Sequence, residues 1–379
     1  MKRYYLTALL LWAILSVAYS QASFTKSETL RVIDKVNAYW QQNNPKHGRS
    51  FWDNAAYHTG NMEVYFLTGN ENYLRYTEEW AKHNEWKGAK SNNKNEWKYS
   101  YGETDEYVLF GDYQICFQNY ADLYMLSPDP KKIARAREVM EYQMSTDRND
   151  YWWWSDGLYM VMPVMTKLYK ITGNDLYLKK LHEYLMYSDS IMYDSEAALY
   201  YRDARYVYPK HQTVNGKKDF WARGVGWVFA GFAKVLKDLP QSAVHRSAYV
   251  KRFQDMAKAI AASQQPGGYW TRSMLDPTFA PGPETSGTAF FTYGFLWGIN
   301  NGLLDKETYG PVALKGWEYL VNTALQENGR IGYVQPIGDR AIPGQVIDAN
   351  STANFGVGAF LLAACEMVRY APESPVLQN

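Results

Sequence analysis

The chain has 379 residues, with 40 Lys plus Arg against 39 Asp plus Glu, and its net charge is +1. This balance gives no basic surface of the kind that binds nucleic acid, and a hydrophobic fraction of 46% excludes a disordered chain. Aromatic residues make up 16% of the chain. Trp and Tyr combine an apolar face with a polar tip, which suits sugar rings, although both are also common core residues.

The first 22 residues follow the pattern of a secretory signal peptide. Lys2 and Arg3 precede an apolar run over residues 6–17, and small residues end the segment near Ser20. The run is shorter than the roughly 20 residues that a membrane-spanning helix needs. We therefore expect cleavage near residues 20–22, export across the inner membrane to the periplasm, and no membrane contact afterwards. Residues 23–379 are predicted to form one domain.

The remaining chain alternates amphipathic helices with loops rich in Gly, Asn, Asp and aromatic residues. After residue 156, apolar side chains recur every three to four positions until a Thr-Gly-Asn turn at 172–174, and residues 228–239 and 357–368 repeat this spacing. A second Thr-Gly-Asn turn at 68–70 joins a similar pair of helices. Repeated helical hairpins predict an all-α closed ring of helix pairs, with an open solenoid as the alternative. Residues 198–208 show only weak strand-like alternation.

Two cysteines and six histidines give little support for a metal site. Cys116 and Cys365 both lie in apolar helical patterns, where either a disulfide or two buried free thiols would fit. No local spacing of these residue types suits zinc, and we predict neither a metal nor another cofactor.

Two aspartates stand at loop-to-helix junctions. Asp156 follows three consecutive tryptophans, and Asp112 opens the apolar stretch that continues through Phe117 and Leu123. In a ring of hairpins such junctions meet at one rim, so the two carboxyls could face one pocket. Two close carboxyls push their pKa values apart, and an apolar wall keeps one of them neutral. The alternative is that both merely stabilise helix starts.

Two further segments contain polar groups among glycines. Arg223 lies in residues 220–227 and has a planar fork suited to a carboxylate, although it could instead stack on a neighbouring Trp. Glu284 lies in the polar loop 281–288, where it could bind a hydroxyl group or start a helix.

Taken in order, these segments resemble the unsaturated uronyl hydrolases of glycoside hydrolase family 105 and, more distantly, those of family 88. The resemblance covers most of the chain and includes residues 52–54, 111–112, 154–160, 221–227, 284–289 and 355–361. It implies a single-domain (α/α)6 barrel. It also implies hydrolysis that removes a 4,5-unsaturated uronic acid from the non-reducing end of oligosaccharides made by polysaccharide lyases.

The resemblance also implies roles for individual residues. Asp156 matches the general acid and base that protonates C4 of the enol ether and activates the water that attacks C5. Asp112 matches a second aspartate that orients or tunes it. Arg223 and Trp227 match substrate contacts, and Trp154 matches the tryptophan two residues before the catalytic acid.

This chain departs from the family pattern at two histidines. Where relatives carry a histidine after a Leu-Phe-Tyr-like stretch, this chain has Arg202, which could contact a carboxylate or sulfate. The other histidine has no match near residues 143–150. Tyr57 and His58 lie near a region of family substrate contacts and are included as binding candidates, as is Glu284.

The leading predicted substrates are unsaturated rhamnogalacturonan oligosaccharides. Unsaturated uronides from ulvan or from arabinogalactan side chains are the alternatives within the same enzyme class. Two other classes remain open at this stage, a polysaccharide lyase on a similar barrel and a sugar-binding protein without catalytic activity.

Overall fold

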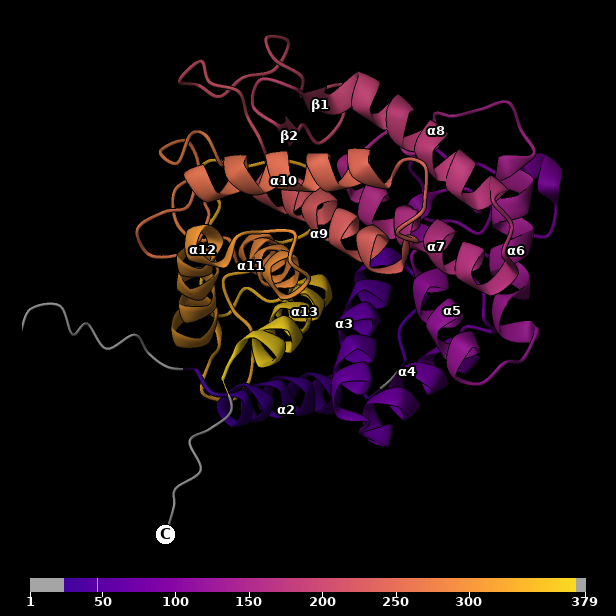
Figure 1. The fold of residues 1–379 in the computed structure, drawn as a ribbon, viewed down its shortest axis with the longest axis horizontal. Helices are drawn as coiled ribbons and strands as arrows, with labels where there is room; N and C mark the ends of the chain where they lie inside the picture. Colours follow the sequence, from indigo (N-terminus) through magenta and orange to yellow (C-terminus); the bar gives the residue numbers. More distant parts are fainter. Residues whose placement is uncertain (1–23, 46, 373–379) are drawn as a thin grey trace, which may run out of the picture.

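The computed structural model describes residues 24–45 and 47–372, and the predicted signal peptide lies outside these residues. In the described part, six inner helices form a ring (Figure 1). They are α3 (Trp52–Thr68), α5 (Cys116–Leu126), α7 (Ser155–Thr172), α9 (Ala222–Asp238), α11 (Thr285–Asn300) and α13 (Asn354–Tyr370). Each packs against the next, and α13 packs against α3, which closes the ring and excludes an open solenoid.

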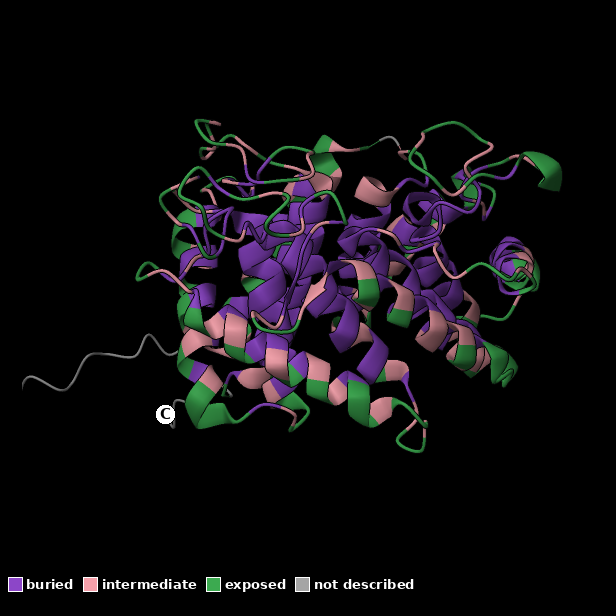
Figure 2. Ribbon diagram, turned by 90° about the horizontal axis from the view of Figure 1, so that it is seen from above, coloured by how far each residue is buried: buried purple, intermediate pink, exposed green. Residues whose placement is uncertain are grey.

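Outer helices cover the ring, one against each inner helix. They are α2 (Lys26–Asn43), α4 (Glu71–His83), α6 (Lys131–Met144), α8 (Leu176–Met192), α10 (Arg246–Ala262) and α12 (Lys306–Tyr319). This arrangement confirms the predicted (α/α)6 barrel. Buried residues concentrate on the inner helices, whereas exposed ones lie on the outer helices and loops (Figure 2).

The Thr-Gly-Asn turns end inner helices as predicted. Helix α3 ends at Thr68 and α7 at Thr172, and the following Gly69 and Gly173 have φ values of 66° and 68°. Glycine adopts this left-handed conformation without the steric cost that a Cβ atom imposes. Asn70 then accepts a hydrogen bond from the backbone of the next helix. Local sequence thus sets these hairpins.

Loop length differs sharply between the two ends of the barrel. Short connections such as 69–70 and 173–175 join five of the inner helices to the outer helices that cover them, whereas α13 is covered by α2, which precedes α3. The return connections, including 84–115, 193–221 and 325–353, are much longer and lead to the starts of the inner helices. Because the inner helices are parallel to one another, these long loops and all the inner N-termini gather at one rim.

Irregular elements lie mostly within the long loops. They are the 3₁₀ helices η1 (Lys94–Glu96) and η2 (Gly111–Tyr113), the π-helical turn η3 (Leu320–Ala324), and two antiparallel strands, β1 (Tyr193–Asp194) and β2 (Leu199–Tyr200). Cys116 and Cys365 are buried free thiols. Within the described ranges, no helix has the length and apolar character needed to cross a bilayer.

Candidate active site

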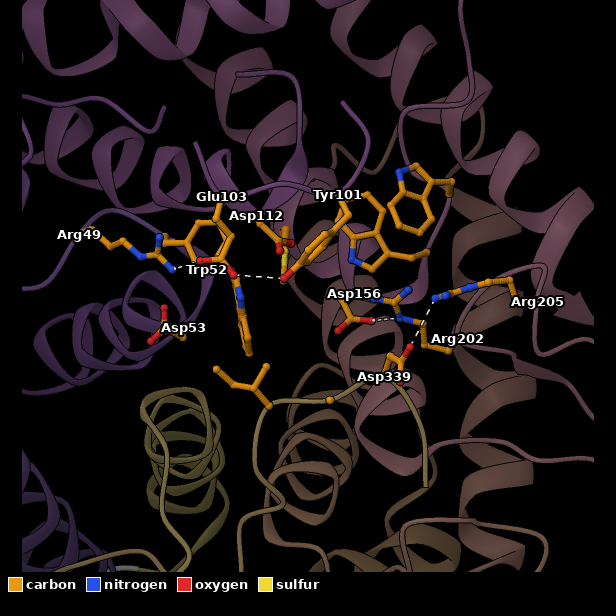
Figure 3. Close-up of a pocket in the computed structure, with 16 residues that line it drawn as sticks. Arg49, Trp52, Asp53, Tyr101, Glu103, Asp112, Asp156, Arg202, Arg205 and Asp339 are labelled. Atoms are coloured by element: carbon orange, nitrogen blue, oxygen red, sulfur yellow. Dashed lines mark hydrogen bonds and ion pairs between the residues drawn. The ribbon is translucent and has the colours of Figure 1, made fainter. Parts of the chain in front are cut away.

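A cavity of about 670 Å³ opens at the rim where the long loops gather (Figure 3). Its walls come from the starts of α3 and α7, from η2 and from five of the loops that lead to inner helices. The lining residues are Arg49, Phe51, Trp52, Asp53, Tyr101, Glu103, Asp112, Trp153, Trp154, Asp156, Met160, Arg202, Arg205, Ile337, Gly338 and Asp339. Several acids and bases therefore share one space large enough to hold sugar rings.

Asp156 lies in the first turn of α7 and is 8% exposed. Its Oδ2 accepts a hydrogen bond from Ser155 Oγ at 3.0 Å and lies 3.8 Å from Nε of Arg202. Burial raises the pKa of Asp156 above its usual range, while the nearby guanidinium groups of Arg202 and Arg223 act to lower it. The carboxyl is therefore easier to protonate than an exposed aspartate.

Asp112, in η2, reaches the same cavity from a different loop. Burial, and after it the charge of Asp156, raises the pKa of Asp112 well above the usual aspartate range. Its Oδ1 is buried and has no hydrogen-bond partner among the residues that the structure describes. An unpartnered buried oxygen favours the neutral acid, because an ionised carboxylate would lose its hydration without compensation. Both carboxyls therefore keep a proton more readily than exposed aspartates do, and the charge of Asp156 adds to this effect at Asp112.

Trp154 separates the backbone segments that carry the two acids. Its ring packs on Phe110 at 4.8 Å between centroids. A Cβ atom added at Gly111 would lie 3.0 Å from this ring, and one at Gly157 would lie 3.2 Å from it. The indole therefore fits between Gly111, which precedes Asp112, and Gly157, which follows Asp156, because neither glycine carries a Cβ atom.

Arg202 is held in place by both its backbone and its side chain. Its carbonyl accepts a hydrogen bond from Ser155 N at 2.8 Å, and its Nη1 donates to Asp203 Oδ2 at 2.6 Å. The guanidinium carbon lies 5.6 Å from the centre of the Trp153 ring. Within the described part of the chain, the buried Nε has no hydrogen-bond partner. A fixed cation with a spare donor thus lies beside Asp156.

The opposite side of the cavity contains residues that sequence reasoning missed. Figure 3 shows Arg49, Asp53 and Trp52 across the cavity from Asp156 and Arg202. Arg49 Nη2 donates to Glu103 Oε2 at 2.6 Å, and the Tyr101 hydroxyl donates to the same carboxylate. Arg205 and Asp339 are further missed lining residues. Arg49, Arg205 and Asp339 belong to loops without a recognisable motif, so only the fold brings them together, whereas Trp52 and Asp53 lie in the segment 52–54 that carries the resemblance but were not predicted as site residues.

Tyr57 and His58 lie outside the cavity, contrary to the prediction. The Tyr57 hydroxyl donates to Asn37 Oδ1 at 2.5 Å, on outer helix α2. His58 Nδ1 lies 3.0 Å from Thr77 Oγ1, and its ring stacks on Trp80 at 4.0 Å, both on α4. Both side chains are buried because they point from α3 toward the outer layer, away from the cavity.

Three further predicted substrate contacts are not among the residues that line the cavity. Trp227 is fully buried and packs on Tyr159 and Phe290 in the centre of the barrel. Arg223 donates to two loop carbonyls, and Glu284 accepts hydrogen bonds from the backbone at the start of α11. All three lack exposed surface for a ligand, because the barrel uses them for packing and for satisfying buried polar groups.

Carboxyl and guanidinium groups are the titratable and charged side chains nearest Asp156 in the cavity. Across residues 24–45 and 47–372, the structure contains no group of three or more His, Cys, Asp or Glu side chains placed to hold a metal ion. A carboxyl pair beside an arginine, in a cavity at the rim of an (α/α)6 barrel, supplies groups that can donate and accept protons.

Comparison with known proteins assigns the chain to a family. Residues 25–371 match Glycosyl Hydrolase Family 88, and the chain belongs to this family of glycosidases. It is 33% identical over 364 residues to the unsaturated 3S-rhamnoglycuronyl hydrolase of Formosa agariphila, with 93% of each chain covered. A solved family 88 glycosyl hydrolase from Bacteroides vulgatus is 66% identical, with a TM-score of 0.90 and coverage of 92% of this chain and 100% of that one.

Two other solved structures bear on the fold. One, described as a polysaccharide lyase, is 73% identical and has a TM-score of 0.90, with 91% of this chain and 98% of that chain covered. The other, a possible family 105 member from Salmonella enterica, is 18% identical and covers 92% of this chain and 95% of that one, with a TM-score of 0.73. At this low identity the second supports the barrel fold alone.

Proposed function

We propose that the protein removes a 4,5-unsaturated uronic acid from the non-reducing end of lyase-generated oligosaccharides. The observation that carries this proposal is the presence of two buried carboxyls, Asp112 and Asp156, in one cavity beside Arg202. The name of the Formosa relative, an unsaturated rhamnoglycuronyl hydrolase, supports the same substrate class.

Arg202 is proposed to bind the carboxylate of the unsaturated sugar. Its side chain lines the cavity, is 13% exposed and lies beside Asp156, so the accessible part of the guanidinium group can pair with a bound carboxylate. That carboxylate would also offset the positive charge that lowers the pKa of Asp156. Substrate binding therefore favours the protonated form of Asp156, which is the form that the proposed reaction needs.

The proposed reaction begins when Asp156 gives its proton to C4 of the enol ether. Water adds to C5 and loses a proton to the resulting Asp156 carboxylate, which restores the acid. The product is a hemiketal at C5. Its collapse opens the ring and breaks the glycosidic bond at C1, which frees the remaining oligosaccharide and a keto acid. One water molecule is consumed and the acid is regenerated, so no cofactor is required for balance.

We propose that the sugar linked to the unsaturated uronate is rhamnose. Rhamnogalacturonan fragments are the leading substrates on sequence resemblance, and the Formosa relative also has a name that refers to a rhamnoglycuronyl unit. Ulvan-derived and arabinogalactan-derived unsaturated oligosaccharides are the alternatives to compare in the same assay.

The purified chain, incubated with unsaturated rhamnogalacturonan oligosaccharides, tests the proposal. Hydrolysis consumes the conjugated double bond, so we expect near-ultraviolet absorbance to fall as free uronate-derived keto acid forms. A rise in absorbance on the uncut polysaccharide would instead indicate the lyase suggested by the description of one solved relative. Binding without any absorbance change would indicate a sugar-binding protein, and either result would refute the proposal.

We further propose that the protein works in the periplasm. The support is the charged start and apolar run of the first 22 residues. Cell fractionation with an antibody, together with N-terminal sequencing of the mature protein, tests this. We expect periplasmic protein that begins near residues 21–23, and a cytoplasmic protein with an intact N-terminus would contradict the proposal.

A further inference from the structure

Asp203 lies behind the arginine of the active site. Its carboxylate accepts a hydrogen bond from Arg202 Nη1 at 2.6 Å, and its side chain is only 3% exposed. Asp203 is not among the residues that line the cavity, so a ligand there meets Arg202 rather than this carboxylate. Any effect of Asp203 on the reaction therefore acts through its neighbours.

The backbone at Asp203 is fixed to the segment that carries the acid. Trp154 and Asp203 form an antiparallel β-bridge, and Ser155 N donates to the Arg202 carbonyl at 2.8 Å. The Asp203 carboxylate also accepts hydrogen bonds from Arg205, at 2.9 Å from the backbone N, 3.0 Å from Nε and 2.9 Å from Nη2. The carboxylate therefore has a defined position relative to the start of α7.

Two carboxyl groups compete for the Arg202 guanidinium group. Asp203 Oδ2 lies within hydrogen-bond distance of Nη1, whereas Asp156 Oδ2 lies 3.8 Å from Nε, which is too far for a hydrogen bond. Nε itself is buried and has no hydrogen-bond partner within residues 24–45 and 47–372. Arg202 is thus hydrogen bonded to Asp203, while Asp156 lies near its charge without such a bond.

This difference matters for an acid that must donate a proton. An arginine beside an aspartate lowers the aspartate pKa by about 1–3 units, most strongly when the two are hydrogen bonded. Burial raises the pKa of Asp156, and Arg202 is the main group that opposes this effect. Burial also acts to raise the pKa of Asp203, but hydrogen bonds from Arg205 and Arg202 lower it below its usual range. Asp203 therefore stays ionised and attracts Arg202.

Other charged groups also face Asp156 from the surrounding elements. They are Asp112 from η2, Arg223 from α9, Arg205 and Asp339 from long loops, and Arg49, Asp53 and Glu103 across the cavity (Figure 3). In the described part of the chain, Arg202 is the one cation that forms an ion pair with Asp156. The position of Arg202 therefore has the strongest influence on how readily this acid loses its proton.

We propose that Asp203 is a positioning residue that holds the Arg202 guanidinium group back from Asp156 and so keeps this acid able to donate its proton. The inference rests on the proposed hydrolase function and adds to it a residue outside the cavity. Without the charge of Asp203, Arg202 closes a hydrogen-bonded ion pair with Asp156, and the acid ionises at lower pH.

Asp203→Asn tests the inference. Asparagine keeps the oxygen that accepts from Arg205 N but lacks the charge that attracts Arg202. The substrate is an unsaturated uronate linked to L-rhamnose, and kcat/KM is measured against pH from the loss of near-ultraviolet absorbance. Since kcat/KM reports the free enzyme, we expect its fall at high pH to move to lower pH by about one pH unit or more.

Asp189→Asn is the matched control. Asp189 also pairs with an arginine, Arg252, at 2.8 Å and has a side chain that is 13% exposed, but it does not line the cavity. A purely structural loss lowers stability in both variants without moving the high-pH fall of kcat/KM. We therefore expect Asp189→Asn to keep this fall at the pH of the parent protein.

A double variant shows whether Asp203 acts through Arg202. Arg202→Gln with Asp203→Asn is compared with Arg202→Gln alone, and this comparison also applies if Asp203→Asn does not fold, because removing both charges of a buried pair is less costly than removing one. The two high-pH falls should agree within about 0.3 pH unit.

Two results would overturn the positioning role while leaving the hydrolase function intact. One is an unmoved high-pH fall in Asp203→Asn, and the other is a fall at lower pH in the double variant than in Arg202→Gln alone. Absence of turnover by the unaltered protein would instead refute the proposed function itself.

Discussion

Replacing Arg223 by methionine tests whether this arginine supports the cavity wall or contacts substrate. Its guanidinium group is almost fully buried, lies 4.5 Å from the centre of the Trp221 ring and 4.7 Å from that of Phe355, and donates to two carbonyls. It also lies 4.0 Å from Glu284 Oε1. Methionine preserves much of the length but leaves the two carbonyls and the buried Glu284 without this cation.

The expected cost follows from this burial. Removing one partner of a buried, hydrogen-bonded charge pair costs about 3–5 kcal/mol in the free energy of unfolding. Arg205 provides a matched control, because it borders the same cavity, also pairs with carboxylates, and has a side chain that is 61% exposed. Exposed pairs contribute up to about 1 kcal/mol, so Arg205→Met should have a small effect on stability.

Urea unfolding followed by tryptophan fluorescence measures both variants. We expect Arg223→Met to lower the unfolding midpoint strongly with a similar slope, and Arg205→Met to leave the midpoint nearly unchanged. If Arg223→Met does not fold, Arg223→Lys is measured instead. Lysine keeps the charge but lacks the planar guanidinium group that donates to two carbonyls, so the free energy of unfolding should fall by an intermediate amount. A loss below about 1 kcal/mol in Arg223→Met, accompanied by a fall in kcat/KM, would refute the supporting role and favour direct substrate contact.

Three other substitutions test the electrostatics of the fold. The raised pKa of Asp112 means that the folded protein loses stability as the pH rises above the ordinary aspartate pKa of about 4, because the unfolded chain then ionises more readily than the folded one. Asp112→Asn should therefore become increasingly stabilising, relative to the parent protein, as the pH rises from about 4. Urea midpoints measure this, and a difference independent of pH would contradict it. Arg202→Gln removes a charge that lowers the pKa of Asp156. The fall of kcat/KM at high pH, which reports loss of the acid proton, should therefore move to higher pH, and KM should rise about 10-fold or more. A high-pH fall at the same pH as in the parent protein would argue against the interaction between Arg202 and Asp156. Tyr249→Phe removes a buried hydroxyl that has no hydrogen-bond partner among the described residues, so the free energy of unfolding should stay the same or rise. A loss above about 1 kcal/mol in urea unfolding would show that this hydroxyl does make a hydrogen bond.

Local sequence signals predicted the barrel well. The apolar spacing of the inner helices and the Thr-Gly-Asn turns each depend on a few neighbouring residues, so they can be recognised without knowing the fold. The same logic placed Asp112 and Asp156 at one rim, since both lie at the beginning of inner helical segments. The structure brings both into one cavity.

Residue type alone was a poor guide to substrate contacts. Arg223, Glu284 and Trp227 have side chains that suit a sugar acid, but the barrel buries them to satisfy carbonyls, cap a helix and fill its centre. Conversely, Arg49 and Asp339 reach the cavity from long loops. Their positions depend on contacts with distant segments, which no local pattern encodes.

The central claim is that the Asp156 carboxyl supplies the proton for hydration of the double bond. Asp156→Asn keeps the shape and hydrogen-bonding capacity of the side chain but cannot act as the acid. Turnover of the unsaturated uronyl rhamnoside should fall by at least about 10²-fold to 10⁴-fold. Calorimetry should show that the same disaccharide still binds. Turnover at the rate of the parent protein, with binding intact, would contradict the account.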